Sequence, residues 1–337
     1  MSQEDLLVFF YLASELLQLW IHIYQEIERF SVECPFESNT TLLHVASRYC
    51  LSSVVSAILN LDDVEADLKD AGDRTPLSWA AGHGHETIVK LLIERDDVET
   101  DSKDEFERTP LYFAAESGHD TVVKLLIERD DVEINLKNSY DSQTSLSQAA
   151  VGGHETIVKL LIERDDIETD SKDGYGQTSL SWAAKYKHET IVKLLIERDD
   201  VEINSKDYNG RTSLSLAAER GHETIVKLLI ERDDVEINSK DYNGRTSLSL
   251  AAEYEHETIV KMLIERDDVD MNSKDRNART PLSLAAERGH ETIVKMLIER
   301  DDVEINSEDC NGWTPLYWAM LNEQKAVVKL LQLAREV

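Results

Sequence analysis

Glycine, proline and cysteine are scarce in this 337-residue chain, which has 13 Gly, 5 Pro and 3 Cys. So little Gly and Pro excludes collagen-like and low-complexity classes and favours a mostly helical chain. The cysteines, Cys34, Cys50 and Cys310, are widely spaced and form no CxxC pair. This excludes a disulfide-stapled scaffold and fits a reducing compartment, so we expect a cytoplasmic protein with the nucleus as a second location.

Basic residues are also in short supply. The chain has 36 Lys and Arg against 67 Asp and Glu, a net charge of −31, and so acidic a surface repels phosphate backbones. We therefore expect no direct nucleic-acid binding. The one apolar stretch, residues 6–24, contains Glu15, Gln18 and His22 and follows no Lys or Arg, so neither a signal peptide nor a membrane span is expected.

Apolar residues are too few for one ordinary core. They make up 41% of the chain and charged residues 31%, against typical values of about 45–50% and about 25%. The length also exceeds the roughly 250–300 residues at which a single core stops growing. Several domains, or an architecture without a central core, are expected.

An internal repeat decides between these two. The segment Thr212–Arg245, TSLSLAAERGHETIVKLLIERDDVEINSKDYNGR, returns almost unchanged from Thr246. Its first threonine recurs every 34 residues, with one step of 35 before Thr144, and a period of this size indicates stacked structural units. Nine units follow one another, and they begin at residues 41, 75, 109, 144, 178, 212, 246, 280 and 314.

Each unit is predicted to be a helix, a turn, a second helix and a hairpin. The threonine caps a first helix that contains Ala217-Ala218 and ends near Gly221, a residue suited to a left-handed cap. The second helix, HETIVKLLIER, carries an apolar stripe wide enough to contact its neighbours. At the hairpin tip, Asp241-Tyr-Asn-Gly244 combines an Asp that bonds its own backbone with a Gly suited to positive φ.

These units resemble the ankyrin repeat, as Thr75-Pro-Leu-Ser-Trp-Ala-Ala, Gly84-His85 and Ile88-Val-Lys-Leu-Leu92 show. The resemblance implies an all-α ankyrin-repeat α-solenoid over residues 41–337, with a helix-turn-helix and a β-hairpin per repeat. The family's His after T-P-L survives only as His44 and is mostly Ser. The family's G-A-D is R-D-D here, so an Asp is expected to end the second helix with some strain. The phrase ERDDVEINSKD resembles filamentous-fungal ankyrin arrays.

Recurrent polar residues invite a search for chemistry. A histidine stands ten residues after the anchor threonine in seven units. Stacked helices lie about 8–10 Å apart, too far for shared zinc ligands at about 2.0–2.1 Å, so we expect each His to bond the loop that enters the second helix. The acidic run Glu231–Asp234 lacks calcium-loop spacing and is interpreted as a solvated edge. We expect no catalysis, metal or cofactor.

Positions that vary within the fixed frame are the candidates for partner binding. The resemblance places hairpin tips and first helices on a concave ligand face, which predicts a protein partner there, along repeats three to seven. Tyr, Trp and Arg dominate interface energetics. The predicted contact residues are Phe106, Tyr140, Tyr175, Tyr186, Tyr208, Arg211, Tyr242, Arg245, Tyr254 and Arg276. For Trp79 and Trp182, inward packing is an equal alternative.

Residues 1–40 precede the array. We expect a helical cap on the first repeat, or a truncated F-box-like start, because residues 12–19 resemble the opening of that motif with Ala13 at its usual Pro. The expected function is a monomeric, non-enzymatic scaffold or regulatory adaptor. Three alternatives stay open: a ubiquitin-ligase substrate adaptor, a transcription coregulator and a detached recognition arm of a larger receptor.

Overall fold

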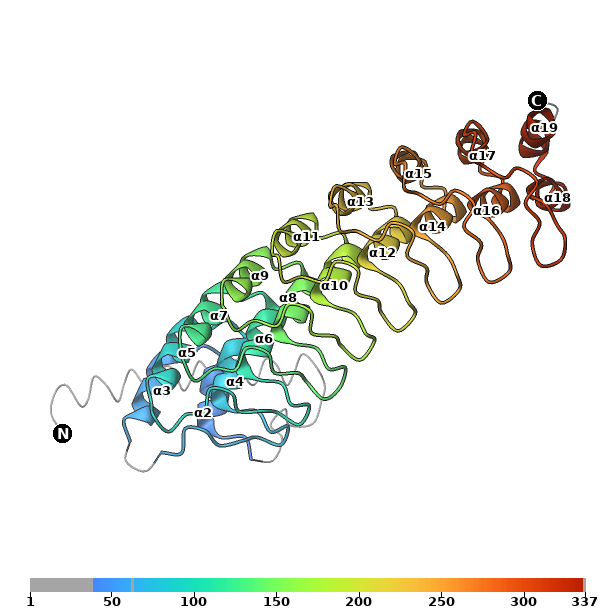
Figure 1. Ribbon diagram of the computed structural model, residues 1–337. Coiled ribbons are helices and arrows are strands. Elements are labelled where there is room, and N and C mark those ends of the chain that lie inside the picture. The colour runs from blue at the N-terminus through green and yellow to red at the C-terminus, as the bar shows by residue number, and fades with distance from the viewer. Residues whose placement is uncertain (1–38, 62–63, 336–337) are drawn as a thin grey trace. The chain divides into compact units, whose positions relative to one another are not determined.

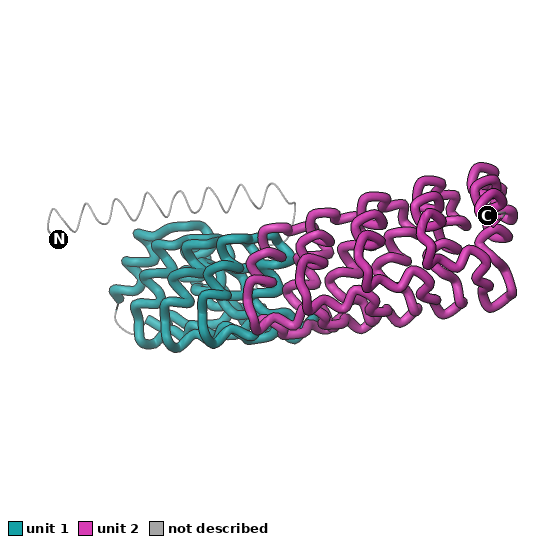
Figure 2. The backbone as a smooth tube through the Cα atoms, turned by 45° about the horizontal axis from the view of Figure 1, so that its top comes forward, with its two compact units in different colours: residues 1–168 teal, residues 169–337 magenta. Residues whose placement is uncertain are grey.

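The structure is a computed structural model that describes residues 39–61 and 64–335. The chain divides into two compact units, residues 1–168 and 169–337 (Figure 2). The N-terminal segment expected to be a cap or an F-box-like start therefore lies, apart from its last two residues, outside the described residues. No helix in the described ranges is long and apolar enough to cross a membrane.

Unit 1 contains four helix pairs in its described part. The even-numbered first helices stack on one another, and each packs against its own second helix (Figure 1). The helices are α2 (Leu42–Arg48), α3 (Ser52–Leu59), α4 (Pro76–Gly82), α5 (Glu86–Ile93), α6 (Pro110–Ser117), α7 (Asp120–Ile127), α8 (Ser145–Gly152) and α9 (Glu155–Ile162).

Unit 2 repeats this arrangement with five helix pairs. First helices, second helices and loop tips again form three rows (Figure 1). The helices are α10 (Ser179–Tyr186), α11 (Glu189–Ile196), α12 (Ser213–Arg220), α13 (Glu223–Ile230), α14 (Ser247–Glu253), α15 (Glu257–Ile264), α16 (Pro281–Arg288), α17 (Glu291–Ile298), α18 (Pro315–Leu321) and α19 (Lys325–Ala334).

The first helices begin and end as the sequence predicts. Thr212 Oγ1 accepts a hydrogen bond from the backbone N–H of Ser215 at 3.3 Å, a cap worth about 1 kcal/mol. At the other end Gly221 adopts φ +75°. Lys187 and Glu255 take the same left-handed conformation without being glycine, so these two repeats carry backbone strain that Gly221 avoids.

Packing between repeats stabilises these helices. At 7 to 10 residues they are too short to be stable alone in water. Ala217, Ala218, Ile225 and Val226 are completely inaccessible to solvent, because the small Ala pair lets neighbouring first helices approach closely. Leu228 is the exception in the predicted apolar stripe, since its side chain stays half-exposed.

The expected β-hairpin is present only as a turn, and no strand occurs in the described ranges. In the tip that precedes Thr212, Asp207 N–H donates to Arg211 O at 2.9 Å and Gly210 N–H to Asp207 O at 2.8 Å. Neighbouring tips are joined by single bonds such as Tyr208 N–H to Tyr175 O, 3.0 Å. One bond per neighbour is too few for a β-ladder.

The expectation that a strained Asp ends the second helix is wrong. Glu231 caps α13 with an ordinary right-handed backbone, φ −74° and ψ −11°, and positive φ occurs at no Arg-Asp-Asp position among the described residues. Instead, the Arg232 guanidinium donates to both carboxylate oxygens of Asp234 and, at 3.0 Å, to the carbonyl of Ile196 that ends α11. The side chain thus satisfies a helix-terminal carbonyl that a glycine cap leaves to the backbone.

A uniform stack predicts that one repeat can be removed. Deleting Thr212–Arg245 should leave a soluble, helical protein that still melts cooperatively, at a slightly lower temperature, because the flanking repeats present the same packing surfaces. Circular dichroism and thermal melting measure this. Loss of helicity or gross aggregation would contradict the nearest-neighbour stack.

Candidate functional site: the tip face

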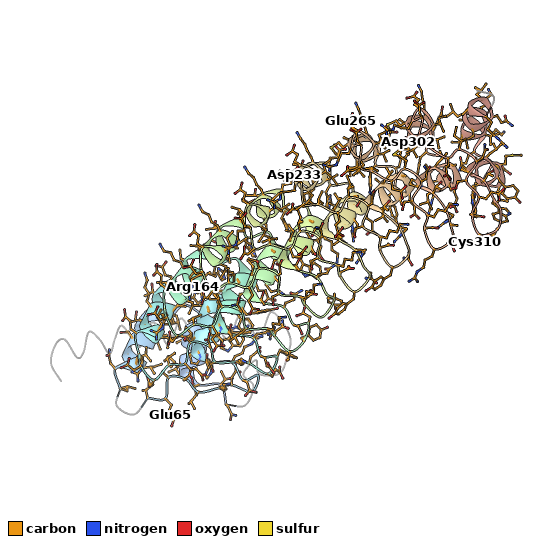
Figure 3. The ribbon with its side chains drawn as sticks, in the orientation of Figure 1. Glu65, Arg164, Asp233, Glu265, Asp302 and Cys310 are labelled. Carbon is orange, nitrogen blue, oxygen red and sulfur yellow. The ribbon has the colours of Figure 1, made fainter. Side chains whose placement is uncertain are left out.

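The tips and the exposed parts of the first helices form one surface in each unit, which we call the tip face. Figure 3 shows Cys310 at a tip of unit 2, whereas Asp233 and Glu265 lie beside the second helices. The predicted aromatic contact residues at the tips are exposed, with Phe106 at 39%, Tyr140 at 79%, Tyr175 at 57%, Tyr208 at 64% and Tyr242 at 59%.

A buried carboxylate holds each regular tip in shape. Asp207 is 2% exposed, and its Oδ1 accepts hydrogen bonds from the backbone N–H groups of Asn209 and Arg211 at 2.9 and 2.8 Å. The same double bond recurs at the other tip aspartates, which are Asp70, Asp104, Asp173, Asp241, Asp275 and Asp309. Buried charge is tolerated only where such partners surround it.

The second oxygen of this aspartate is satisfied in one of two ways. Where the first helix carries Trp, the indole N–H donates to Oδ2, as Trp182 does to Asp173 at 2.8 Å. Where it carries Leu or Phe, an Arg four residues after the Asp donates instead, as Arg211 does to Asp207 at 3.0 Å. The other Trp donors are Trp79 and Trp318, and the other Arg donors are Arg108, Arg245 and Arg279.

This pairing changes the interpretation of two predicted contact residues. Arg211 also lies 3.4 Å from Glu219, and its side chain is only 22% exposed; Arg245 lies 3.3 Å from Glu253 and is 18% exposed. Both guanidinium groups have an internal role, so their part in partner binding stays a prediction. Arg276 differs, because it occupies the tip position of Tyr208 and its side chain is exposed.

The tip tyrosines are held against the preceding tip. A Cβ added to Gly176 would lie 2.6 Å from the Tyr208 ring, and one added to Gly210 would lie 2.7 Å from Tyr242. Both glycines also have positive φ. The turn itself also forms with Asp73, Glu107 or Ala278 at this position, but at Gly176 and Gly210 the absence of a Cβ leaves room for the next tip's ring to pack against the backbone.

The first helices contribute a second aromatic group. Tyr186, 48% exposed, stacks on Trp182 with ring centroids 5.5 Å apart and planes at 4°, and Lys185 Nζ lies 4.2 Å from the Trp182 ring centroid. Trp182 itself is only 7% exposed, so the inward-packing alternative is confirmed for it. Tyr254 is 44% exposed and caps α14.

The tip that precedes Thr144 departs from the pattern, and the sequence analysis missed the residue at its centre. Asn138 replaces the tip aspartate, and Tyr112 Oη accepts hydrogen bonds from the Asn138 and Gln148 side-chain amides at 2.9 and 2.7 Å. Burial raises the pKa of Tyr112 to about 12. The signal was the single 35-residue step before Thr144, which lengthens this tip by one residue.

The histidines link neighbouring repeats and do not bond their own loop as expected. His222 Nε2 lies 3.1 Å from the carbonyl oxygen of Lys185, near the end of the preceding first helix. A carbonyl only accepts, so this ring nitrogen carries the hydrogen. The same bond is made by His85, His119, His154, His256 and His290. Among the described residues, no group of His, Cys, Asp and Glu could hold a metal ion.

The edge opposite the tip face carries the loops that follow the second helices. It is more than a solvated surface, because polar side chains there make hydrogen bonds between neighbouring repeats. In four repeats an Asn bridges to the next repeat: Asn204 Nδ2 donates to Asp234 O at 2.8 Å, and its Oδ1 accepts from Glu236 N–H at 2.8 Å. In other repeats an Asp stands at this position. Asp101 Oδ2 accepts from Glu133 N–H at 2.7 Å, but its Oδ1 is buried with no hydrogen-bond partner in the described part of the chain.

The Asp101 carboxylate therefore has one oxygen without a hydrogen-bond donor, whereas both polar atoms of the Asn204 amide have a partner. Burial raises the pKa of Asp67 and of Asp101 to about 6 and also raises the pKa of Asp170, with neighbouring carboxylates such as Glu99 and Glu133 acting in the same direction. A protonated carboxyl supplies the donor that Asn supplies elsewhere. Since the folded pKa lies above the unfolded value, these aspartates lower stability as the pH rises from about 4 to about 6.

We expect Asp101→Asn to stabilise the protein at neutral pH by about 1 kcal/mol, the usual cost of one unsatisfied buried group. The gain should vanish toward pH 4, where the native Asp is protonated. Chemical denaturation at both pH values measures it. Asn204→Asp is the matched control and should show the reverse effect; an equal effect of either substitution at both pH values would contradict the missing-donor explanation.

Three partly buried histidines, of which only His222 belongs to the row that links neighbouring repeats, predict acid sensitivity of opposite sign. Burial lowers the pKa of His44, His83 and His222, so protonation opposes folding and stability should fall as the pH drops below about 6.5. His222→Gln offers an amide donor for Lys185 O without a titrating ring, and a Gln, Gln324, stands at the equivalent position of the last repeat. This variant should lose less stability than the wild type between pH 7 and pH 5.

The same structural role predicts no dependence on metal. A chelator should leave the melting temperature unchanged, because each Nε2 already bonds a backbone carbonyl. Metal analysis of the purified protein provides the second readout. Stoichiometric zinc, or unfolding caused by the chelator, would overturn the structural role of the histidines.

Comparison with known families agrees with the geometry. The family model for ankyrin repeats in three copies matches residues 42–138, 131–207, 180–275 and 267–336, which cover nearly the whole described chain. No curated protein matches the chain. The described helices follow the family's helix-turn-helix pattern in both units. The chain is a member of the ankyrin-repeat family.

Proposed function

We propose that the protein is a non-enzymatic adaptor or scaffold that binds a protein partner on its tip face. Ankyrin repeats generally mediate protein–protein interaction, and the observation that supports this surface is the set of exposed tip tyrosines, two of which, Tyr208 and Tyr242, pack against the glycine of the preceding tip. A large aromatic side chain whose ring already packs against the protein loses less conformational entropy on binding than a free one. Aromatic residues of this kind are enriched among the residues that dominate binding energy.

The opposite edge is the competing surface, and its charges are less suited to recognition. Arg232 is paired with Asp234, and the same Arg-Asp pair recurs at the end of α5, α7, α9, α11, α15 and α17. The remaining aspartates, such as Asp233, are exposed and repeat without variation. Isolated surface charges contribute little affinity and are screened by salt.

The proposal includes a monomeric protein in the cytoplasm, with the nucleus as a second location. No catalysis and no cofactor are part of it. The net charge of −31 also disfavours direct contact with nucleic acid. The role as ubiquitin-ligase adaptor, transcription coregulator or receptor arm depends on the partner, which affinity capture with the full chain would identify.

Substitution of tip tyrosines tests the proposed face. With a captured partner, Tyr208→Ala plus Tyr242→Ala should weaken binding by about 2 kcal/mol or more, roughly thirtyfold, because two fixed aromatic contacts are lost. Isothermal titration calorimetry or surface plasmon resonance measures the change.

The matched control is Asp233→Ala plus Asp267→Ala on the opposite edge of the same unit. These aspartates are exposed, and they leave the Arg232–Asp234 and Arg266–Asp268 pairs intact. The control should cost well under 1 kcal/mol. If the two aspartate substitutions weaken binding as much as the two tyrosine substitutions, the partner binds the opposite edge.

A further inference from the structure

On the tip face of unit 1, two arginines, Arg48 and Arg74, have guanidinium groups with no hydrogen-bond acceptor among the described residues. The guanidinium carbons of Arg48 and Arg74 lie 4.6 and 4.8 Å from the centroid of the Trp79 ring. Arg74 also lies 4.8 Å from the Phe113 ring. These rings hold the flat guanidinium groups in place, so the donors are positioned before any ligand binds.

A pocket of about 220 Å³ opens beside them. Its lining includes His44, Arg48, Asp70, Arg74, Trp79, Glu105, Phe106 and Arg108. Formally the lining carries three arginines and two carboxylates. The distribution of hydrogen-bond donors and acceptors, however, is not balanced.

The buried acceptors near the pocket are already used. Asp70 accepts from the backbone N–H groups of Gly72 and Arg74 and from the Trp79 indole. Asp104 accepts two bonds from the Arg108 guanidinium at 2.9 and 2.7 Å, besides its backbone bonds. Arg74 Nε is left 3.9 Å from this carboxylate, beyond hydrogen-bonding distance.

The electrostatics of Arg74 agree with a missing anion. Burial, and next the charge of Arg108, lower the pKa of Arg74, while Asp104, Asp70 and Glu116 oppose this only in part. Its side chain is 30% exposed and so reachable from solvent. In the described part of the chain neither Arg48 nor Arg74 makes a side-chain hydrogen bond to a carboxylate.

We propose that this pocket, the Arg48–Arg74 pocket, binds an acidic side chain of an extended segment of the protein partner. A carboxylate accepts from planar guanidinium groups with two parallel bonds and removes the donor excess. Phe106, 39% exposed, separates the pocket from the neighbouring one over Tyr112, Tyr140 and Gln148. This neighbour offers aromatic and amide surface to the adjoining partner residues, and because Glu116 and Asp141 also line it, those adjoining residues should not be acidic.

The inference rests on the proposed function and names the chemistry of the partner. The test is selection from a displayed library of random short peptides with the full chain as bait. Peptides selected by the wild type should be enriched in Asp or Glu. They should bind Arg48→Ala plus Arg74→Ala roughly tenfold or more weakly in fluorescence anisotropy, because two charge-assisted contacts are lost.

Two further variants separate the possible causes. Arg48→Lys plus Arg74→Lys keeps the charge but not the planar fork, and it should also lose most of the affinity. Arg220→Ala plus Arg288→Ala removes two other first-helix arginines, in unit 2, and should leave binding within about twofold. Circular dichroism confirms that each variant is folded like the wild type.

The outcomes distinguish this inference from the proposed function. If the selected peptides show no acidic enrichment, or bind the Arg48/Arg74 variants as well as the wild type, the pocket is not a carboxylate site. If in that case Phe106→Ala or Tyr140→Ala still weakens binding, the tip face stands as the partner surface. If the full chain selects no peptide that binds the tip face, both proposals fail.

Discussion

A buried carboxylate beneath every tip but the one with Asn138 organises the described repeats. Its Oδ1 accepts two backbone N–H groups, which fixes the turn, and the turn in turn places the exposed aromatic on its outside. Burying this charge is favourable only if the other oxygen is also satisfied. Two positions are therefore coupled, one in the first helix and one just before the anchor threonine. Trp182 donates to the second oxygen beneath one tip, and Arg211 does so beneath the next.

This coupling limits what the tip face can vary. Arg211 and Arg245 look like free contact residues in the sequence, but each is a structural donor to the aspartate four positions earlier. Only residues outside the coupled set, such as Tyr208, Tyr242 and Arg276, can change without disturbing the turn. Arg74 is the instructive exception. In its repeat Trp79 satisfies Asp70, which leaves the arginine free of that task and over the pocket.

The sequence predicted the fold well because the repeat period, the capping threonines, the Ala pair and the turn glycines are all local signals. It failed where contacts cross between repeats. The His222 bond to Lys185 and the Arg232 bond to Ile196 join residues 36 or 37 positions apart, and no pattern within one unit indicates them. The exposed tyrosines of the tip face could be predicted from their variation between repeats. The alternation of Trp and Arg as donors to the tip aspartate, and the hydrogen bonds around Tyr112, could not, because each depends on which side-chain donor reaches a particular oxygen in the folded structure.

Most recurring bonds between neighbouring repeats end on the backbone of the adjacent unit. Hydrogen bonds to a backbone carbonyl or amide N–H are made by the histidine, by the arginine after the second helix and by the bridging Asn. A peptide group is present whatever the side chain, so one repeat does not need a particular neighbour. The side-chain pair beneath a tip, in contrast, lies within about ten consecutive residues and is copied together with its repeat. An array built this way can gain or lose whole units by genetic recombination without first acquiring compensating substitutions at the new junction.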